Sequence, residues 1–286
     1  MQRNPLVRQL ILLALEEDLS GGDITSQLTI DARLTGQAEV LARQTLTVCG
    51  LFLLEEVCEQ AGMKLEVELL AKEGNSAAEG DVLARLSGSI AEILAIERVC
   101  LNFLQRTCGV ATHTRTIVGQ LPVDAALLLD TRKTIPGWRI LDKYAVRTGG
   151  GVNHRLTLGD MILVKDNHIA ACGGSIANAL SRVFAAKPSY MPVEVEISNL
   201  TELSDALKFD VDVVMLDNMR GEELGEAVAL TRERAPHVKI EVSGGVRADQ
   251  LSAIVKAGVD TVSMGALTHS APAVDIALEV RDERPV

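Results

Sequence analysis

Residues Asp130–Ile169 read DTRKTIPGWRILDKYAVRTGGGVNHRLTLGDMILVKDNHI, and the rest of the chain is organised around them. Between Thr131 and Lys165 the stretch holds seven Lys or Arg residues and two acids, a formal charge of +5. The whole chain carries −11, so the remainder carries −16 (−11 minus +5). A basic island in an acidic protein indicates a pocket for small anions. Nucleic acid would require an extended basic face with stacking aromatics, and only 2% of the residues are aromatic.

The composition indicates a soluble globular enzyme. A length of 286 residues suits one large or two ordinary domains, and the contents of 47% hydrophobic and 23% charged residues are ordinary. The apolar run Leu10–Leu15 is too short to span a bilayer and lacks a basic region and a cleavage site, which predicts a cytoplasmic protein. The five cysteines are odd in number and contain no C-x-x-C pair, which favours reduced, buried thiols over disulfides or a zinc site.

The first 86 residues predict a mixed α and β unit. Asn4-Pro5 is typical of a helix start, and Gly21-Gly22 would end that helix. Asp23 then caps the next segment, a reading we favour over a functional role for Asp23 and Thr25. Further along we expect strands at 37–42, 46–48 and 81–86, a helix at 51–61 ended by Gly62, and a half-buried strand through Leu65, Val67 and Leu69. The unit has neither a phosphate loop nor metal-ligand spacing.

A capping box, Ser89-Ile-Ala-Glu92, opens a further helix. Arg106 is predicted to lie in its last turn, before Gly109. There the arginine would stabilise the negative end of the helix, or it would bind an anion in a cleft. Spacing alone slightly favours the first interpretation.

From residue 126 onward, six short apolar runs alternate with helix-like segments. The spacing of roughly 20–35 residues is that of βα units, which build a closed barrel or a doubly wound sheet. No G-x-G-x-x-G follows a strand, so an open dinucleotide-binding sheet is less favoured. The runs are Ala126–Leu129, Met161–Val164, Val193–Val195, Val213–Leu216, Ile240–Val242 and Thr261–Met264.

Each run is followed closely by a charged, hydroxylated or glycine residue, and in a barrel these residues share the rim where active sites are built. Glycines allow backbone N–H groups to approach a phosphate, although they also make tight turns. Paired carboxylates hold Mg²⁺ or ribose hydroxyls, although they also occur as a solvated pair. Cations grip carboxylates or phosphates. The glycine positions are Ser243-Gly244-Gly245 and Gly265, the acids are Glu196 and Asp217, and the cations are Arg132, Lys133, Arg155 and Lys165, with His154 a weaker and His168 the weakest candidate.

This set predicts a site for two anionic ligands, one of them phosphorylated. No Ser-His or Cys-His pair is evident. Lys165 at a strand end could instead form a Schiff base with a sugar phosphate, which leaves an aldolase as an alternative. A relative that binds an anion without turnover is a third reading, but it would not need both halves of a two-substrate site.

The chain resembles the quinolinate phosphoribosyltransferase family over nearly its whole length. The similarity lies in EEDLSGGDITS, LNFLQRTCGVAT, DTRKTIPGWRILDKYAVRTGGGVNHR, LVKDNHI, VEVE, MLDNM, EVSGGV and MGALTHS, in family order. Ile135 and Trp138 depart from the expected pattern, and neither replaces a charged position. The resemblance implies an N-terminal α/β sandwich domain (1–115), a TIM-like α/β barrel of seven strands (116–270), and a C-terminal segment (271–286) that packs on the N-terminal domain.

The resemblance also implies residue roles. Arg132, His154, Arg155 and Lys165 would bind the carboxylates of quinolinate, and Lys133 would lie near the pyrophosphate. Glu196 and Asp217 would bind the ribose hydroxyls of phosphoribosyl pyrophosphate, directly or through Mg²⁺, the implied cofactor, so Lys133, Glu196 and Asp217 form the catalytic set. Ser243, Gly244, Gly245 and Gly265 would hold the 5-phosphate. In a homodimer or a hexamer, Arg106 would reach the site of a neighbouring subunit.

The implied reaction transfers phosphoribosyl to quinolinate. Pyrophosphate leaves, the ring nitrogen attacks the ribose, and the 2-carboxylate departs as CO₂ to give nicotinate mononucleotide, a step of NAD biosynthesis. Such chemistry depends on positioning and electrostatics more than on acid–base catalysis. No nucleic acid and no membrane are expected as partners.

Overall fold

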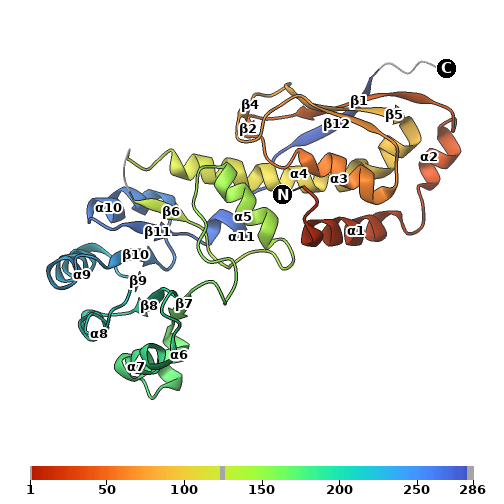
Figure 1. Ribbon diagram of the computed structural model, residues 1–286. Coiled ribbons are helices and arrows are strands. Elements are labelled where there is room, and N and C mark those ends of the chain that lie inside the picture. The colour runs from red at the N-terminus through yellow and green to blue at the C-terminus, as the bar shows by residue number, and fades with distance from the viewer. Residues whose placement is uncertain (1, 123–125, 282–286) are drawn as a thin grey trace. The chain divides into compact units, whose positions relative to one another are not determined.

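The computed structural model describes residues 2–122 and 126–281, and the chain forms two compact units (Figure 1). The first unit comprises Met1–Arg115, Thr134–Gly150 and Leu267–Val286, and the second comprises Thr116–Lys133 and Gly151–Ala266. Residues 134–150, which the sequence analysis assigned to the barrel, therefore belong with the first unit. Residues 282–286 of the expected C-terminal segment lie outside the described residues.

The first unit is built on an antiparallel sheet in the order β12-β1-β5-β3. β1 (Thr35–Ala42) lies between β5 (Val82–Ser89) and β12 (Ile276–Arg281), so the first and the last strand of the described chain are neighbours in one sheet. β3 (Glu66–Leu69) is an edge strand in which Val67 is partly buried between the exposed Glu66 and Glu68, as the predicted alternation requires, whereas Leu69 is exposed. A two-stranded sheet joins β2 (Leu46–Thr47) to β4 (Ser76–Ala77).

Two of the helices predicted in the first unit begin and end close to the predicted residues, and a third does not. Asn4 caps α1 (Pro5–Leu19), and Asp23 caps α2 (Ile24–Thr29), which confirms the cap reading of Asp23. Gly62 ends α3 (Phe52–Ala61) in the left-handed conformation that favours glycine. The unit also contains α5 (Arg139–Thr148) and most of α11 (Ala266–His269).

The exception is α4 (Ile90–Val118), which runs straight through Gly109 for 29 residues. The prediction that this helix ends near Gly109 was wrong, and so was the placement of Arg106 in a last turn. Gly109 has another purpose, because a Cβ atom built there would lie 2.2 Å from the carbonyl oxygen of Pro272. The glycine lets the segment before β12 cross the helix in direct contact with its backbone.

Replacing Gly109 with alanine should therefore destabilise the protein, by about 1–3 kcal/mol or more, since the clash is with backbone that cannot rotate away. Urea denaturation measures the loss. The control is Gly225→Ala in α9 (Gly221–Arg234), where nothing lies within 4 Å of the added Cβ. That change should be neutral or slightly stabilising. Equal effects of both changes would contradict this account of Gly109.

The second unit carries a parallel sheet in the order β6-β11-β10-β9-β8-β7. All six predicted runs are strands, which confirms the α/β barrel-like class. Figure 1 shows the helices α7, α8, α9 and α10 along one side of this sheet. The strands are β6 (Leu127–Leu129), β7 (Ile162–Val164), β8 (Val193–Ile197), β9 (Val213–Asp217), β10 (Lys239–Ser243) and β11 (Thr261–Ser263), and the remaining helices are α6 (Asp166–Ala171), α7 (Ile176–Ala186), α8 (Leu200–Ala206), η1 (Ala248–Gln250) and α10 (Leu251–Lys256).

The strands of the second unit alternate between two faces. Val195, Val214 and Ile240 have no exposed surface and point to the helix side, as do their neighbours two residues further on. The resemblance implied seven strands, whereas the ladder contains six. Val152 forms a single parallel bridge to Leu129, at the position where a seventh strand would join β6.

The state of the cysteines agrees with the prediction of reduced thiols. All five cysteines are free thiols, and four of them are buried, as predicted. Burial raises the pKa of the Cys58 thiol to about 11 and that of Cys108 to about 12, so neither is a reactive thiolate at neutral pH.

Among the residues the structure describes, no helix combines the length and the apolar character needed to cross a membrane.

Candidate active site

A cavity of about 570 Å³ opens at the carboxyl ends of the strands of the second unit. Its walls come from β7, β8, β9, β10 and β11 and from the segments after β6 and before β7. Ten of the twelve residues that the sequence predicted for substrate binding line this one cavity: Arg132, Lys133, His154, Arg155, Lys165, Glu196, Asp217, Ser243, Gly244 and Gly245. The cavity is thus bordered by four cations and by carboxylates on neighbouring strands.

The cations of the cavity are close enough to interact. The Nε atom of Arg132 is buried and has no hydrogen-bond partner among the described residues. Burial lowers the pKa of the Arg155 guanidinium, and the positive charge of Arg132 lowers it further. Lys165 Nζ donates to Glu196 Oε2 at 2.7 Å, so this lysine is paired with an acid of the same cavity. The grouped positive charge favours an anion with more than one negative group.

The buried carboxylate of Asp130 holds the segment that carries His154 and Arg155. Its Oδ1 accepts the backbone N–H of His154 at 2.8 Å, and its Oδ2 accepts the side-chain amide of Asn153 at 2.6 Å. Asp130 follows β6 directly and has no exposed surface. The end of β6 and the segment of residues 153–155 are therefore locked together at the wall of the cavity.

Asp217 ends β9 beside a strained turn. The next residue, Asn218, has a φ of 58°, which is unusual for a non-glycine residue, and its side-chain amide donates to Asp217 Oδ2 at 2.8 Å. Gly244, with a φ of 82°, lies against this turn, because a Cβ built on it would be 2.4 Å from Asn218 Oδ1 and 2.5 Å from Asp217 Oδ1. Strained backbone of this kind gathers at functional sites.

The loop after β10 is held in place by hydrogen bonds from Arg220 and Ser263. The Arg220 guanidinium donates to the carbonyl oxygens of Ser243 and Gly244, and burial lowers the pKa of this arginine. The hydroxyl of Ser263 donates to that of Ser243 at 3.0 Å. With its carbonyls held by Arg220, the loop is fixed beside Asp217, and its glycines leave room for a ligand to approach the backbone.

Two predicted residues do not line the cavity. Gly265 lies just after β11 and is not part of the wall. Arg106 belongs to the first unit, where its Nη2 donates to Asp142 Oδ1 at 3.0 Å and to the carbonyl of Thr268 at 2.5 Å. His168 has a structural position, since its Nδ1 accepts the backbone N–H of Lys165 at the start of α6.

Several wall residues were missed by the sequence analysis. Thr131, Asn218, Glu241 and Ser263 also line the cavity. Glu241 could have been found from alternation, because it lies two residues before Ser243 on the same strand and so faces the same side. By the same rule Glu194 faces the same side of β8 as Glu196.

Two family descriptions match the chain. Residues 23–108 match the N-terminal domain of quinolinate phosphoribosyl transferase, and residues 110–279 match its C-terminal domain. Together they cover most of the sequence, in the order that the sequence analysis expected.

Named relatives and solved structures agree. A probable nicotinate-nucleotide pyrophosphorylase [carboxylating] of Bacillus subtilis is 39% identical over 264 residues, which cover 92% of this chain and 90% of the relative. A quinolinate phosphoribosyltransferase [decarboxylating] of Nicotiana tabacum is 36% identical, covering 97% and 83%. The solved nicotinate-nucleotide pyrophosphorylase of Francisella tularensis superposes with a TM-score of 0.90 at 38% identity, covering 98% of each chain.

Proposed function

This chain belongs to the quinolinate phosphoribosyltransferase family, and from that premise we propose that it transfers phosphoribosyl from phosphoribosyl pyrophosphate to quinolinate with loss of CO₂. The products are nicotinate mononucleotide, pyrophosphate and CO₂. The observation that carries this proposal is the single cavity that combines four cations with the Glu196–Asp217 pair and the Ser243–Gly245 loop. Such a cavity has complementary groups for both substrates, which an aldolase or a simple anion binder would not need.

We assign the quinolinate half of the cavity to Arg132, Arg155 and Lys165, with His154 at the wall. The unpartnered Nε of Arg132 supports this assignment, because a buried donor without a partner is costly unless a ligand supplies an acceptor. Arginine forks also match carboxylate geometry. Lys165 would exchange its contact with Glu196 for a carboxylate of the substrate, which frees Glu196 to interact with the sugar.

We assign the phosphoribosyl half to Glu196 and Asp217 for the ribose hydroxyls, and to the Ser243–Gly245 backbone for the 5-phosphate. Gly265 remains a predicted member of the phosphate site. Glu196 and Asp217 also fit Mg²⁺, because they offer only carboxylate oxygens and Mg²⁺ is commonly bound by one or two carboxylates together with substrate phosphates. When bound, Mg²⁺ would neutralise part of the charge on the pyrophosphate.

The residues of the cavity then act by position and charge. Lys133 would balance the negative charge that grows on the departing pyrophosphate, and Glu196 and Asp217 would stabilise the positive charge on the ribose ring. The arginines would hold the quinolinate ring nitrogen in line with the ribose carbon. Once the nitrogen is bonded to ribose, the ring is cationic and stabilises the electron pair left on C2 when the 2-carboxylate departs as CO₂, and a proton from water then adds to C2.

The partner arrangement and the location are part of the same proposal. Arg106 belongs to the first unit, and its proposed role is to serve the cavity of a neighbouring subunit in a homodimer or a larger oligomer. The Arg106 side chain is 16% exposed. A cytoplasmic location is supported by the free cysteines.

The test is an assay of purified protein with quinolinate, phosphoribosyl pyrophosphate and Mg²⁺, in which nicotinate mononucleotide is detected chromatographically and CO₂ is counted from label in the 2-carboxylate. Formation of both products in equal amounts is expected. Binding of quinolinate without either product would overturn the proposal in favour of a non-catalytic anion binder, and borohydride trapping on Lys165 would indicate an aldolase.

A further inference from the structure

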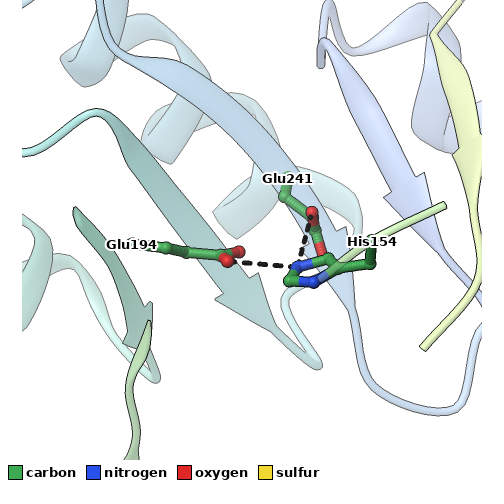
Figure 2. A group of neighbouring side chains, drawn as sticks. All are labelled: His154, Glu194 and Glu241. Carbon is green, nitrogen blue, oxygen red and sulfur yellow. Dashed lines mark ion pairs between the residues drawn. The ribbon is translucent and has the colours of Figure 1, made fainter. Parts of the chain in front are cut away.

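A buried cluster of three side chains extends from the wall of the cavity into the interior of the second unit. Figure 2 shows Glu194 of β8 and Glu241 of β10 pointing toward the imidazole of His154. His154 Nε2 lies 3.1 Å from Glu194 Oε2 and 3.7 Å from Glu241 Oε2. The two carboxylate side chains are 1% and 3% exposed, respectively. Barrel interiors are usually filled by branched apolar residues, so two glutamates here require an explanation.

The imidazole is fixed in one tautomer. Its Nδ1 accepts the backbone N–H of Arg155 at 2.8 Å, so the ring proton lies on Nε2 and faces the two glutamates. A protonated Nε2 cannot act as a metal ligand, which makes the cluster a poor metal site even though its three ligand atoms lie within 4.8 Å of one another. The arrangement suits a proton better than a metal ion.

One imidazole cannot satisfy two buried carboxylates. Among the described residues, no well-formed hydrogen bond is donated to either carboxylate oxygen of Glu194 or to Oε1 of Glu241. The Nε2 atom of His154 nevertheless lies 3.1 Å from Glu194 Oε2. Glu194 is the nearer of the two acids. Burial, and secondarily the charge of Glu194, raise the pKa of Glu241 to about 7, and the neighbouring His154 lowers it only in part. The hydroxyls of Ser263 and Thr261 also lower the Glu241 pKa.

Other charged groups border the same cavity and set the background for Glu241. Positive charge comes from the segments after β6 and before β7 and from the end of β7, and negative charge comes from the ends of β8 and β9. These groups are Arg132, Lys133, Arg155, Lys165, Glu196 and Asp217. A further negative charge on Glu241, which lines the cavity itself, would oppose a substrate that carries two carboxylates.

We propose that Glu241 is a positioning residue that binds a proton beneath the diacid site, and that loss of this proton weakens quinolinate binding. In the protonated state, Glu241 leaves the Nε2–H of His154 directed at Glu194 and adds no charge to the cavity. In the ionised state, it competes for Nε2–H and repels the substrate. The inference rests on the proposed function for its substrate and on the buried cluster for its mechanism.

The experiment compares wild type with Glu241→Gln, which is neutral at every pH and keeps the side-chain shape. KM for quinolinate in the wild type should rise about tenfold between pH 6 and pH 8.5, whereas the Glu241→Gln protein should give a flat profile and kcat should change less than KM. Glu226→Gln, the same substitution on the exposed face of α9, is the control and should follow the wild type. A pH profile of KM that is the same in wild type and Glu241→Gln would overturn the proposal.

Stability supplies a second readout that does not depend on turnover. A folded-state pKa above the unfolded value means that the folded protein binds more protons between about pH 4.5 and pH 7, so Glu241 lowers stability as pH rises through this range. Tm of the wild type should therefore fall relative to Tm of Glu241→Gln over that range. Parallel Tm curves would overturn the proposal, as would a rise in wild-type Tm with Mg²⁺ or Mn²⁺ alone that Glu241→Gln abolishes. Protein that shows the Tm difference but forms no nicotinate mononucleotide would instead contradict the proposed function.

Discussion

Gly244→Ala is expected to lower kcat/KM by about 100-fold or more while the protein remains folded. The added Cβ would lie 2.4 Å from Asn218 Oδ1 and 2.5 Å from Asp217 Oδ1, and φ at this position is 82°. Alanine must therefore leave the left-handed conformation or push Asp217 away from the cavity. Either movement displaces a proposed ribose ligand and the proposed phosphate loop together, so KM for phosphoribosyl pyrophosphate should rise along with the loss of kcat.

Gly258→Ala separates backbone strain from this local effect. Gly258 has a φ of 92°, so alanine there meets the same left-handed penalty, about 1–2 kcal/mol. Its Cβ would lie 3.6 Å from Val228, an ordinary contact, and Gly258 does not line the cavity. We expect a lower Tm with nearly normal kcat. If Gly244→Ala and Gly258→Ala reduce activity equally, the contact of Gly244 with Asp217 is not what matters.

The functional residues at the rim of the barrel could be predicted because they lie at the ends of the apolar runs that form the strands. Lys165, Glu196 and Asp217 each follow or end an apolar run, and parallel strands bring such ends to one side of the sheet. Glu194 and Glu241 were missed because they lie inside otherwise apolar strands. In the sequence VEVE, Glu194 looks like a polar residue of an alternating strand. Only the structure shows that Glu194, Glu241 and the imidazole of His154 lie together.

The fold departed from prediction where long-range contacts overrode local signals. Gly109 looks like a helix stop, since glycine is a poor helix former. Here glycine lies inside the helix, because the segment before β12 crosses so close to position 109 that no side chain would fit. No local pattern contains this information, since Pro272 is remote in sequence. Likewise, only residues 130–133 separate residues 134–150 from β6, yet residues 134–150 belong with the first unit.

The structure describes the contacts of Arg106 within one chain, whereas its proposed function is in the site of a neighbouring subunit. Asp142 is buried and accepts from the Nε and Nη2 of Arg106. Alanine at 106 would remove both of these hydrogen bonds to a buried carboxylate, a change that destabilises the fold. Arg106→Gln is therefore the better variant, because the amide still donates to Asp142 while the charge is removed. It should retain its fold and lose most of its activity.

A mixed dimer of Arg106→Gln and Lys133→Ala subunits should regain activity that neither variant has alone. The Arg106→Gln subunit contributes an intact cavity, and its partner contributes an intact Arg106, so one of the two sites is complete. When the mixed dimer is isolated through two different affinity tags, about half of the wild-type activity is expected from twofold symmetry. Lys133→Ala mixed with Lys165→Ala is the control, since both residues line the same cavity and every site stays defective. If the first mixture recovers no more activity than this control, Arg106 does not act across the interface, and its partners Asp142 and Thr268 account for its presence within one chain.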